Sequence, residues 1–310
     1  MRAAVILRAM NNKISNPQLD IRMGTLVQAN GGAEKTADYI RQILPHGFES
    51  FQINYWEHIR DVNLKETAKR VLEACGDQAT ISSIGVFGNP LQAEETAKAF
   101  EAAIKAAPFF GASIVAGFAG ALEDRPVHEQ MPAFKKVWGR LAKVAESKGV
   151  RIAWENCDMG GSWEAPKWNI AHSPQAWEMM FNEVPSDALG LEWEPCHQMN
   201  SLIDPLPQLR EWMPKIFHLH GKDATVAWDV VRKHGTRGGH AYVWHRTPGF
   251  GDTNWTDVIS ILRQNKWTGA IDIEGWHDPV YSGELEMTGQ VFGLNYLKKC
   301  RGGEFIPNPS

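Results

Sequence analysis

The stretch Leu189-Gly-Leu-Glu-Trp-Glu-Pro-Cys-His197 combines the two features on which the fold and the function of this chain depend. Its first half is short and apolar, as in a buried strand of a parallel sheet, and it stops at Pro195, which has no amide hydrogen to continue a ladder. Because side chains alternate along a strand, Glu192 and Glu194 are predicted to face the same way. A buried strand that ends in carboxylates needs a cation nearby, since an unpaired buried charge is costly.

Three further apolar runs end in the same manner, with a carboxylate or an imidazole at or near the last position. They are Arg151–Glu155, Ile216–His220 and Gly269–Glu274. Neighbouring strands of a sheet lie about 5 Å apart, so four consecutive strand ends can surround one ion. The sequence therefore predicts that one cation has as its ligands Glu155, Glu194, His220 and Glu274.

Strand and helix patterns alternate from residue 21 to residue 300 without a break in composition. Strands are predicted at 21–28, 48–56, 80–87, 113–118, 150–155, 189–194, 216–220 and 269–274. Helices are predicted at 33–44, 64–75, 93–107, 131–148, 173–182, 205–212, 256–264 and 285–299. Eight strand–helix units predict a single-domain α/β fold, a (β/α)8 TIM barrel, because right-handed crossovers build a parallel sheet that closes. An open, doubly wound sheet is the alternative.

These boundaries leave residues 1–20 as an N-terminal extension and residues 301–310 as a loose C-terminal tail, with the barrel at 21–300. Two long insertions, 157–171 and 224–255, are predicted as loops that could close over a substrate. In barrels of this class the active site lies at the carboxyl ends of the strands, which is the end where all four predicted ligands fall.

Composition limits the possible partners of the chain. The formal net charge of −4 argues against a nucleic-acid surface, which normally carries a basic stripe. No apolar run approaches the roughly 20 residues of a membrane helix. The four cysteines form neither a C-x-x-C pair nor a regular framework, so we expect reduced thiols and a cytoplasmic enzyme.

The predicted donor set of three carboxylates and one imidazole favours a hard divalent cation. Mn²⁺ is the first choice and Mg²⁺ or Co²⁺ the alternatives, whereas structural Zn²⁺ prefers thiolate and imidazole. His218 faces the same way as His220 but one layer deeper, where we expect a hydrogen bond in the core. Glu192 is also expected to lie deeper, paired with a basic group such as an Arg or Lys of a neighbouring strand.

The motifs at the strand ends resemble those of the xylose isomerase-like TIM-barrel superfamily. Within it they are most similar to the sugar phosphate isomerase/epimerase branch, which includes ketose 3-epimerases, hydroxypyruvate isomerase and inosose-processing enzymes. The motifs are W-E-N-C at 154–157, L-E-W-E-P-C-H at 191–197, H-L-H-G-K-D at 218–223, R-T-P-G-F-G-D-T-N-W at 246–255 and I-D-I-E at 271–274. The family commonly has Asp where this chain has Glu194, and the extra methylene would shift the ion.

The resemblance implies a divalent-metal-dependent isomerase or epimerase that acts on a keto sugar or polyol. Such enzymes remove a proton beside a carbonyl and return it elsewhere on an enediolate, which requires a Lewis acid and an acid–base pair. Glu155 and Glu274 resemble the two acid/base carboxylates of the family. His197 and Arg246 resemble residues that orient the substrate.

An apolar pocket wall is expected from large aromatic side chains near the strand ends, since aromatic faces suit the C–H face of a sugar ring. They are Trp56, Phe87, Phe118, Trp163 and Trp276. For His197, a hydrogen bond that stabilises its loop is the alternative role. Lys222 is expected to pair with Asp223 and so hold the following loop.

Other functions are compatible with the same barrel. The main alternative is a metal-dependent lyase or glycoside-cleaving enzyme that acts on a 3-keto-glycoside by β-elimination, because the proton abstraction is the same and the long loops suit a larger substrate. Endonuclease IV shares the barrel, but it needs a trinuclear zinc site with additional His ligands. A non-catalytic partner subunit is the last alternative, and a homo-oligomer is compatible with each of them.

Overall fold

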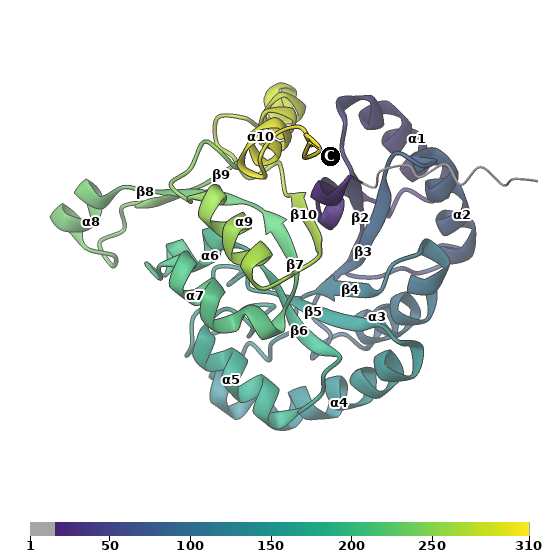
Figure 1. Ribbon diagram of the computed structural model, residues 1–310. Coiled ribbons are helices and arrows are strands. Elements are labelled where there is room, and N and C mark those ends of the chain that lie inside the picture. The colour runs from purple at the N-terminus through teal and green to yellow at the C-terminus, as the bar shows by residue number, and fades with distance from the viewer. Residues whose placement is uncertain (1–15, 310) are drawn as a thin grey trace, which may run out of the picture.

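Short apolar runs form the eight parallel strands of a closed barrel in this computed structural model, which describes residues 16–309 (Figure 1). Around the barrel the order is β1-β10-β7-β6-β5-β4-β3-β2. The strands are β1 (Ile21–Gln28), β2 (Ser50–Trp56), β3 (Thr80–Phe87), β4 (Ile114–Gly117), β5 (Arg151–Glu155), β6 (Leu189–Trp193), β7 (Ile216–Gly221) and β10 (Gly269–Ile273). The predicted TIM barrel is confirmed, and the doubly wound sheet is excluded.

Helices cover the outside of the barrel, and local signals decide where several of them begin or end. The N-cap side chains of Asn63 and Ser173 accept hydrogen bonds from the amides of Glu66 and Ala176, at 3.1 and 3.3 Å. Gly149 ends its helix at a φ of +63°, which a residue without Cβ adopts at no steric cost. The helices are α1 (Ala33–Ile43), α2 (Leu64–Cys75), α3 (Glu94–Ala106), α4 (Met131–Lys148), α5 (Pro174–Glu183), α6 (Pro195–Asn200), α7 (Pro205–Trp212), α8 (Trp228–His234), α9 (Trp255–Gln264) and α10 (Glu286–Cys300).

An aromatic cluster joins α3 and α4 to the barrel wall. Trp138 is fully buried, and its ring packs edge-on against Phe100 and Trp154 at centroid distances of 5.0 and 5.2 Å. Its indole nitrogen donates a hydrogen bond of 2.8 Å to the carbonyl of Ala119. Truncating a side chain of this size in a core costs about 3–5 kcal/mol. This cluster therefore holds β5 and the segment after β4 in place beneath the site.

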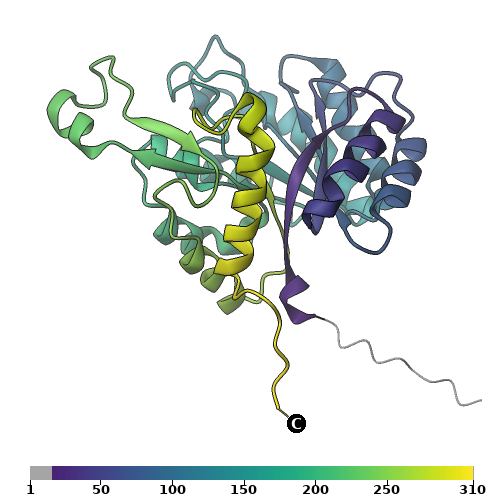
Figure 2. The same cartoon turned by 90° about the horizontal axis from the view of Figure 1, so that it is seen from above.

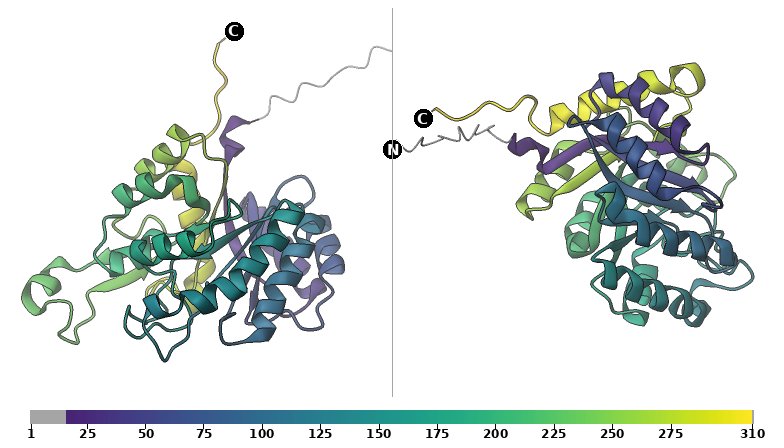
Figure 3. Two further views of the ribbon diagram at one scale, coloured as in Figure 1. Left: turned by 90° about the horizontal axis from the view of Figure 1, so that it is seen from below. Right: turned by 90° about the vertical axis from the view of Figure 1, so that its right-hand side faces the viewer.

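The two ends of the described chain leave the barrel at the same end, where the strands begin (Figure 3). Arg301, predicted as part of a loose tail, is instead almost fully buried at this end. Its guanidinium donates to both carboxylate oxygens of Glu49, at 2.6 and 2.8 Å, and to the carbonyl of Ile21 at 2.7 Å. These bonds fix the end of the last helix, α10, to the beginnings of β1 and β2.

The insertion at 224–255, predicted as a loop, contains a hairpin and a helix. β8 (Asp223–Val226) pairs antiparallel with β9 (Val243–Arg246), and α8 stands at the tip with no buried residue. Figures 1 and 2 show this arm extending away from the barrel. Strands of four residues are too short for their alternation to be recognised, so the loop prediction is wrong here. Among residues 16–309, no helix has the length and hydropathy that crossing a membrane requires.

Candidate active site

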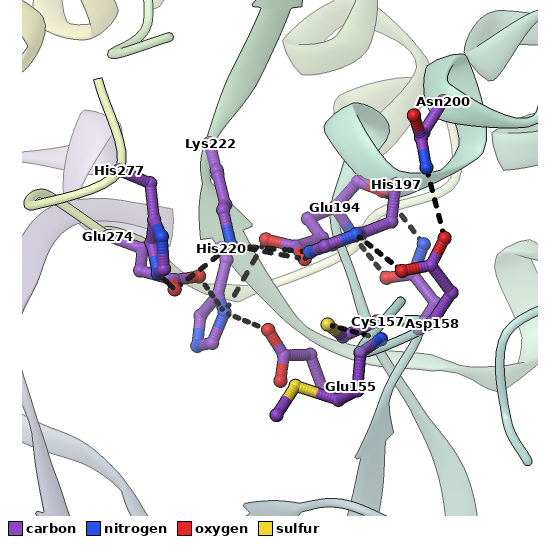
Figure 4. A network of polar contacts seen from close by, with 12 residues as sticks. Glu155, Cys157, Asp158, Glu194, His197, Asn200, His220, Lys222, Glu274 and His277 are labelled. Atoms are coloured by element: carbon purple, nitrogen blue, oxygen red, sulfur yellow. Dashed lines mark hydrogen bonds and ion pairs between the residues drawn. The ribbon is translucent and has the colours of Figure 1, made fainter. Parts of the chain in front are cut away.

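Four strands bring three carboxylates and one imidazole together at the carboxyl end of the barrel (Figure 4). Glu155 ends β5, Glu194 follows β6, His220 lies in β7 and Glu274 follows β10. Each offers a ligand atom within 4.8 Å of those of the other three. The Nδ1 atom of His220 lies 3.4 Å from Glu155, 3.7 Å from Glu194 and 3.3 Å from Glu274. The sequence predicted the convergence of these four side chains, and the structure has it.

The donor atoms of this cluster are buried and short of partners. Glu194 and His220 are fully buried, and Glu155 and Glu274 are at most 7% exposed. No hydrogen bond reaches Nδ1 of His220 or the Oε2 atoms of Glu194 and Glu274. Buried polar atoms are almost always satisfied, so three unpartnered ones that face a common point indicate a missing ligand. A hard divalent cation fits a donor set of three carboxylates and one imidazole.

Lys222 brings a positive charge to one side of the cluster. Its Nζ donates to Glu274 Oε1 at 3.0 Å and lies 3.8 Å from Glu194 Oε1 and 3.3 Å from His197 Nε2. Burial raises the pKa of Glu274, but the Lys222 charge more than offsets this, so the pKa falls well below its ordinary value. Burial and the Glu194 charge raise the pKa of Glu155 to about 8. Glu155 and Glu274 therefore differ strongly in proton affinity.

Lys222 and Asp223 do not pair with each other, which corrects the expectation from the sequence. Asp223 instead accepts hydrogen bonds from the indole of Trp255 at 2.9 Å and from the amides of Thr253 and Ala224 at 3.1 and 2.8 Å. Successive side chains of extended backbone point in opposite directions, so Lys222 enters the site while Asp223 anchors the segment before α9.

Glu192 and His218 occupy the next layer down the barrel. His218 is hydrogen-bonded to Asp272 at 2.8 Å, which confirms the core role predicted for it. Glu192 lies 2.9 Å from His218 Nδ1 and 3.2 Å from His220 Nε2. Its predicted partner, an Arg or Lys, is wrong, because the barrel interior at this depth supplies imidazoles instead.

His197 lies in a helix and not in a loop as predicted. Pro195 stands at the first position of α6, where its fixed φ favours helix formation. The Nε2 atom of His197 is 3.0 Å from Glu194 Oε1, and its ring packs edge-on against His245 at 4.8 Å. His197 lines the pocket and contacts Glu194. Because it lies in a helix, its alternative role of stabilising a loop is wrong, and its role towards a substrate stays a prediction.

Three members of the cluster, Glu155, His220 and Glu274, line a cavity of about 340 Å³ that has an aromatic wall. Trp56 is 47% exposed; its ring stacks on Trp168 at 5.5 Å and meets Phe118 edge-on at 6.4 Å. Of the residues predicted for this wall, those that line the cavity are Trp56, Phe87, Phe118 and Trp276.

Two predicted pocket residues lie elsewhere. Trp163 stacks on His128 at 6.3 Å and packs against the core, because its loop folds back towards the start of α4. Arg246 donates from Nε to Asp278 at 3.0 Å, and its guanidinium lies over the Phe250 ring. Alternate residues of β9 face opposite sides, so its neighbour in the strand, and not Arg246, reaches the pocket.

Among the pocket residues that sequence reasoning missed, three carry a basic side chain, namely Lys222, His245 and His277. Lys222 had a readable signal, since it follows His220 by two positions and so continues the face that points into the barrel. His277, whose Nε2 lies 2.8 Å from Glu274 Oε1, and His245 come from irregular or inserted segments, where no periodicity marks them.

Comparison with known proteins agrees with this architecture. Residues 40–300 match the family model of the xylose isomerase-like TIM barrel. An inosose dehydratase of Clostridium tetani is 24% identical over 277 residues, covering 82% of this chain and 87% of that protein.

Two solved structures illustrate the shared fold. A 3-keto-D-glucoside 4-epimerase from E. coli superimposes with a TM-score of 0.67 at 15% identity, covering 90% of this chain and 100% of that one. A xylose isomerase-like TIM barrel protein from Mycobacterium smegmatis, in complex with magnesium, gives 0.66 at 14% identity and covers 91% and 97%. At these identities the likeness shows the fold alone. With its barrel complete and most of its length matched, the chain belongs to the xylose isomerase-like TIM-barrel family.

Proposed function

We propose that this protein is a divalent-metal-dependent isomerase or epimerase that acts on a keto sugar or polyol. The observation that carries the proposal is the buried cluster of three carboxylates around His220, which has unpartnered donor atoms and three members that line an aromatic-walled cavity. Polar groups that converge on the floor of an apolar pocket are typical of small-molecule sites. Its family includes enzymes that process sugars, which supports the assignment.

The cation would be held by Glu155, Glu194, His220 and Glu274, with Mn²⁺ as the first choice and Mg²⁺ or Co²⁺ as alternatives. When bound, it supplies a Lewis acid that stabilises negative charge on a substrate oxygen. Glu194, which stands where the family commonly has Asp, is contacted by His197 at 3.0 Å.

Glu155 and Glu274 are proposed to move the substrate proton. They come from β5 and β10, which lie on two sides of His220 in the barrel order, so they approach the cavity from different directions. One carboxylate can take a proton beside the carbonyl, and the other can return a proton to the enediolate from the other side. A positioned acid or base of this kind contributes a factor of about 10²–10⁴.

Lys222 and the aromatic wall have separate tasks in this scheme. Lys222 donates to Glu274 and keeps this carboxylate ionised beside the substrate. Trp56 and Trp276 present broad apolar faces against which the C–H face of a sugar can pack. We further propose a cytoplasmic location, because all four cysteines are free thiols.

A metal-dependent lyase, including one that cleaves a 3-keto-glycoside, is the second candidate. It is favoured by the similarity to a dehydratase, since dehydration of a keto sugar is a β-elimination that also begins with proton abstraction. The fold neighbour that acts on a 3-keto-D-glucoside supports the same substrate class. The two candidates differ in what happens after the proton has been removed.

The test is a panel of free ketoses, inososes and 3-keto-glucosides, incubated with the Mn²⁺-loaded protein in D₂O. Deuterium gained at one carbon with an intact skeleton indicates an isomerase or epimerase. Loss of water or of an aglycone indicates the lyase. Protein that exchanges no proton with any compound, although it holds one metal ion per chain, would contradict both candidates.

A further inference from the structure

A second layer of buried acidic and imidazole side chains lies directly below His220. Glu192, His218 and Asp272 are at most 1% exposed, and within residues 16–309 no Lys or Arg forms an ion pair with either carboxylate. The proposed catalytic scheme uses none of them. Buried carboxylates without a basic partner are costly to maintain, so their presence calls for an explanation.

The Nε2 side of the His220 ring faces this layer and Gln52. Nε2 is hydrogen-bonded to Gln52 Oε1 at 3.1 Å and lies within ion-pair range of Glu192 Oε1, at 3.2 Å. The Gln52 oxygen and an ionised carboxylate can only accept, so Nε2 carries the ring proton. The Nδ1 atom then points the other way, towards Glu155 and Glu274.

Glu192 is itself held from below. Its Oε1 is 2.9 Å from His218 Nδ1, and the other ring nitrogen of His218 is hydrogen-bonded to Asp272 at 2.8 Å. Asp272 in turn accepts hydrogen bonds from the hydroxyls of Ser50, at 2.6 Å, and Ser82. The chain of contacts therefore ends on neighbouring strands of the rigid barrel wall.

The backbone leaves room for this arrangement at Gly24. A Cβ atom added there would lie 2.1 Å from both Asp272 Oδ1 and Ser50 Oγ, far inside any permitted contact. The barrel is thus built around the Asp272–Ser50 pair, and a side chain at position 24 would displace it.

We propose that Glu192 is a positioning residue that fixes the ring of His220 with Nδ1 towards the cation site, and that His218 and Asp272 position Glu192. The inference rests on the proposed function, because it assumes a cation at the four carboxylate and imidazole donors. Groups that hold a metal-ligating imidazole by its other nitrogen typically account for a factor of about 10–100 in metal affinity.

Affinity for Mn²⁺, measured by calorimetric titration of the metal-free protein, is the first readout. Glu192→Leu removes the oxygen that faces both imidazoles, and we expect it to weaken binding about 10–100-fold. Glu192→Gln keeps an acceptor of the same shape, so it should lose less than the leucine variant. Asp272→Asn should also weaken binding, because it removes the charge that holds His218 below Glu192 without touching any proposed ligand.

The environment of the Nε2–H group of His220, observed by NMR, is the second readout. A variant of Glu192 would leave it unchanged if Glu192 only stabilised the fold. Protein labelled with ¹⁵N-histidine and loaded with diamagnetic Mg²⁺ should show the Nε2–H proton of His220 shifted downfield by the ionised Glu192 carboxylate that it faces. In Glu192→Leu this proton should move upfield, and in Glu192→Gln the upfield shift should be smaller.

A matched control comes from the opposite end of the barrel. Glu49→Gln weakens the ion pair with Arg301 and so lowers stability, while the hydrogen bonds of Glu49 within residues 16–309 reach Arg301 and Met23 and not the His220 network. We expect its Mn²⁺ affinity and its His220 Nε2–H shift to equal those of the wild type.

The outcomes separate this inference from the function on which it rests. Wild-type Mn²⁺ affinity and an unshifted His220 Nε2–H proton in Glu192→Leu would overturn the positioning role alone. Should that variant not fold, wild-type values of both readouts in Glu192→Gln and Asp272→Asn would do so. A wild-type protein that binds no divalent cation would overturn the proposed function, and the inference with it.

Discussion

The two ends of the barrel treat their carboxylates differently. At the amino end, Glu49 receives two bonds from Arg301, a backbone amide bond from Met23 at 3.0 Å and a contact from Lys298 at 3.5 Å. At the carboxyl end, the Oε2 atoms of Glu194 and Glu274 have no hydrogen-bond partner within residues 16–309. A carboxylate that serves the fold is satisfied by the protein itself, whereas we propose that these two serve a ligand.

The largest expected effect is on catalysis at the carboxyl end. Glu155→Gln and Glu274→Gln each remove one group that can carry the substrate proton, and each should lower kcat by about 10²–10⁴. Proton–deuterium exchange with the best substrate of the panel measures this directly. Circular dichroism that matches the wild type is the control for folding, and wild-type exchange in either variant would contradict the assignment.

The second effect concerns the cation. A ligand that binds only the folded state stabilises it by RT ln(1 + [L]/Kd), which is about 2.7 kcal/mol at a hundredfold excess over Kd. Mn²⁺ should therefore raise the free energy of unfolding of the wild type. Glu194→Ala should lose this response, because it removes one of the four donors. A stabilisation that survives in this variant would place the cation elsewhere.

The amino end should respond in stability alone. Glu49→Gln leaves the buried Arg301 short of a charged partner, which we expect to cost about 1–3 kcal/mol in urea unfolding at neutral pH, with kcat unchanged. Burial raises the pKa of Glu49, but Arg301 outweighs it and holds the pKa below the ordinary 4.5. This stabilising contribution is therefore present above pH 4.5 and is lost as the pH falls through the folded-state pKa. The difference between wild type and variant should shrink at acidic pH, and a constant difference would contradict this pairing.

The smallest effect separates pocket tryptophans from core tryptophans. Trp56→Ala removes a face of the cavity wall and should raise KM by up to about tenfold, as expected for an aromatic contact worth about 0.5–1.5 kcal/mol. Trp163→Ala should lower thermal stability and leave KM unchanged, because Trp163 lies outside the cavity. Equal effects of both variants on KM would contradict the assignment of Trp56 to the pocket and Trp163 to the core.

The part of the site that lies on strands could be predicted from the sequence. Alternation and strand order require that the ends of β5, β6, β7 and β10 meet, so the cluster around His220 follows from local patterns alone. The same rule places Lys222 on the inner face, although the proximity of an opposite charge at Asp223 concealed it.

The part that depends on loops and insertions could not be predicted. Arg246 and Trp163 were expected in the pocket, yet their positions are decided by partners that are distant in sequence, Asp278 and His128. His245 reaches the pocket only because the inserted hairpin adopts a particular register. Such contacts leave no periodic trace in the sequence.

The central claim is that four side chains share one divalent cation. A crystal structure of the protein with Mn²⁺, with data collected to show the anomalous signal of manganese, tests it most directly. The account predicts one strong peak per chain, within coordination distance of Glu155, Glu194, His220 and Glu274. No peak at this position, with the four side chains turned apart or bonded to one another, would contradict it.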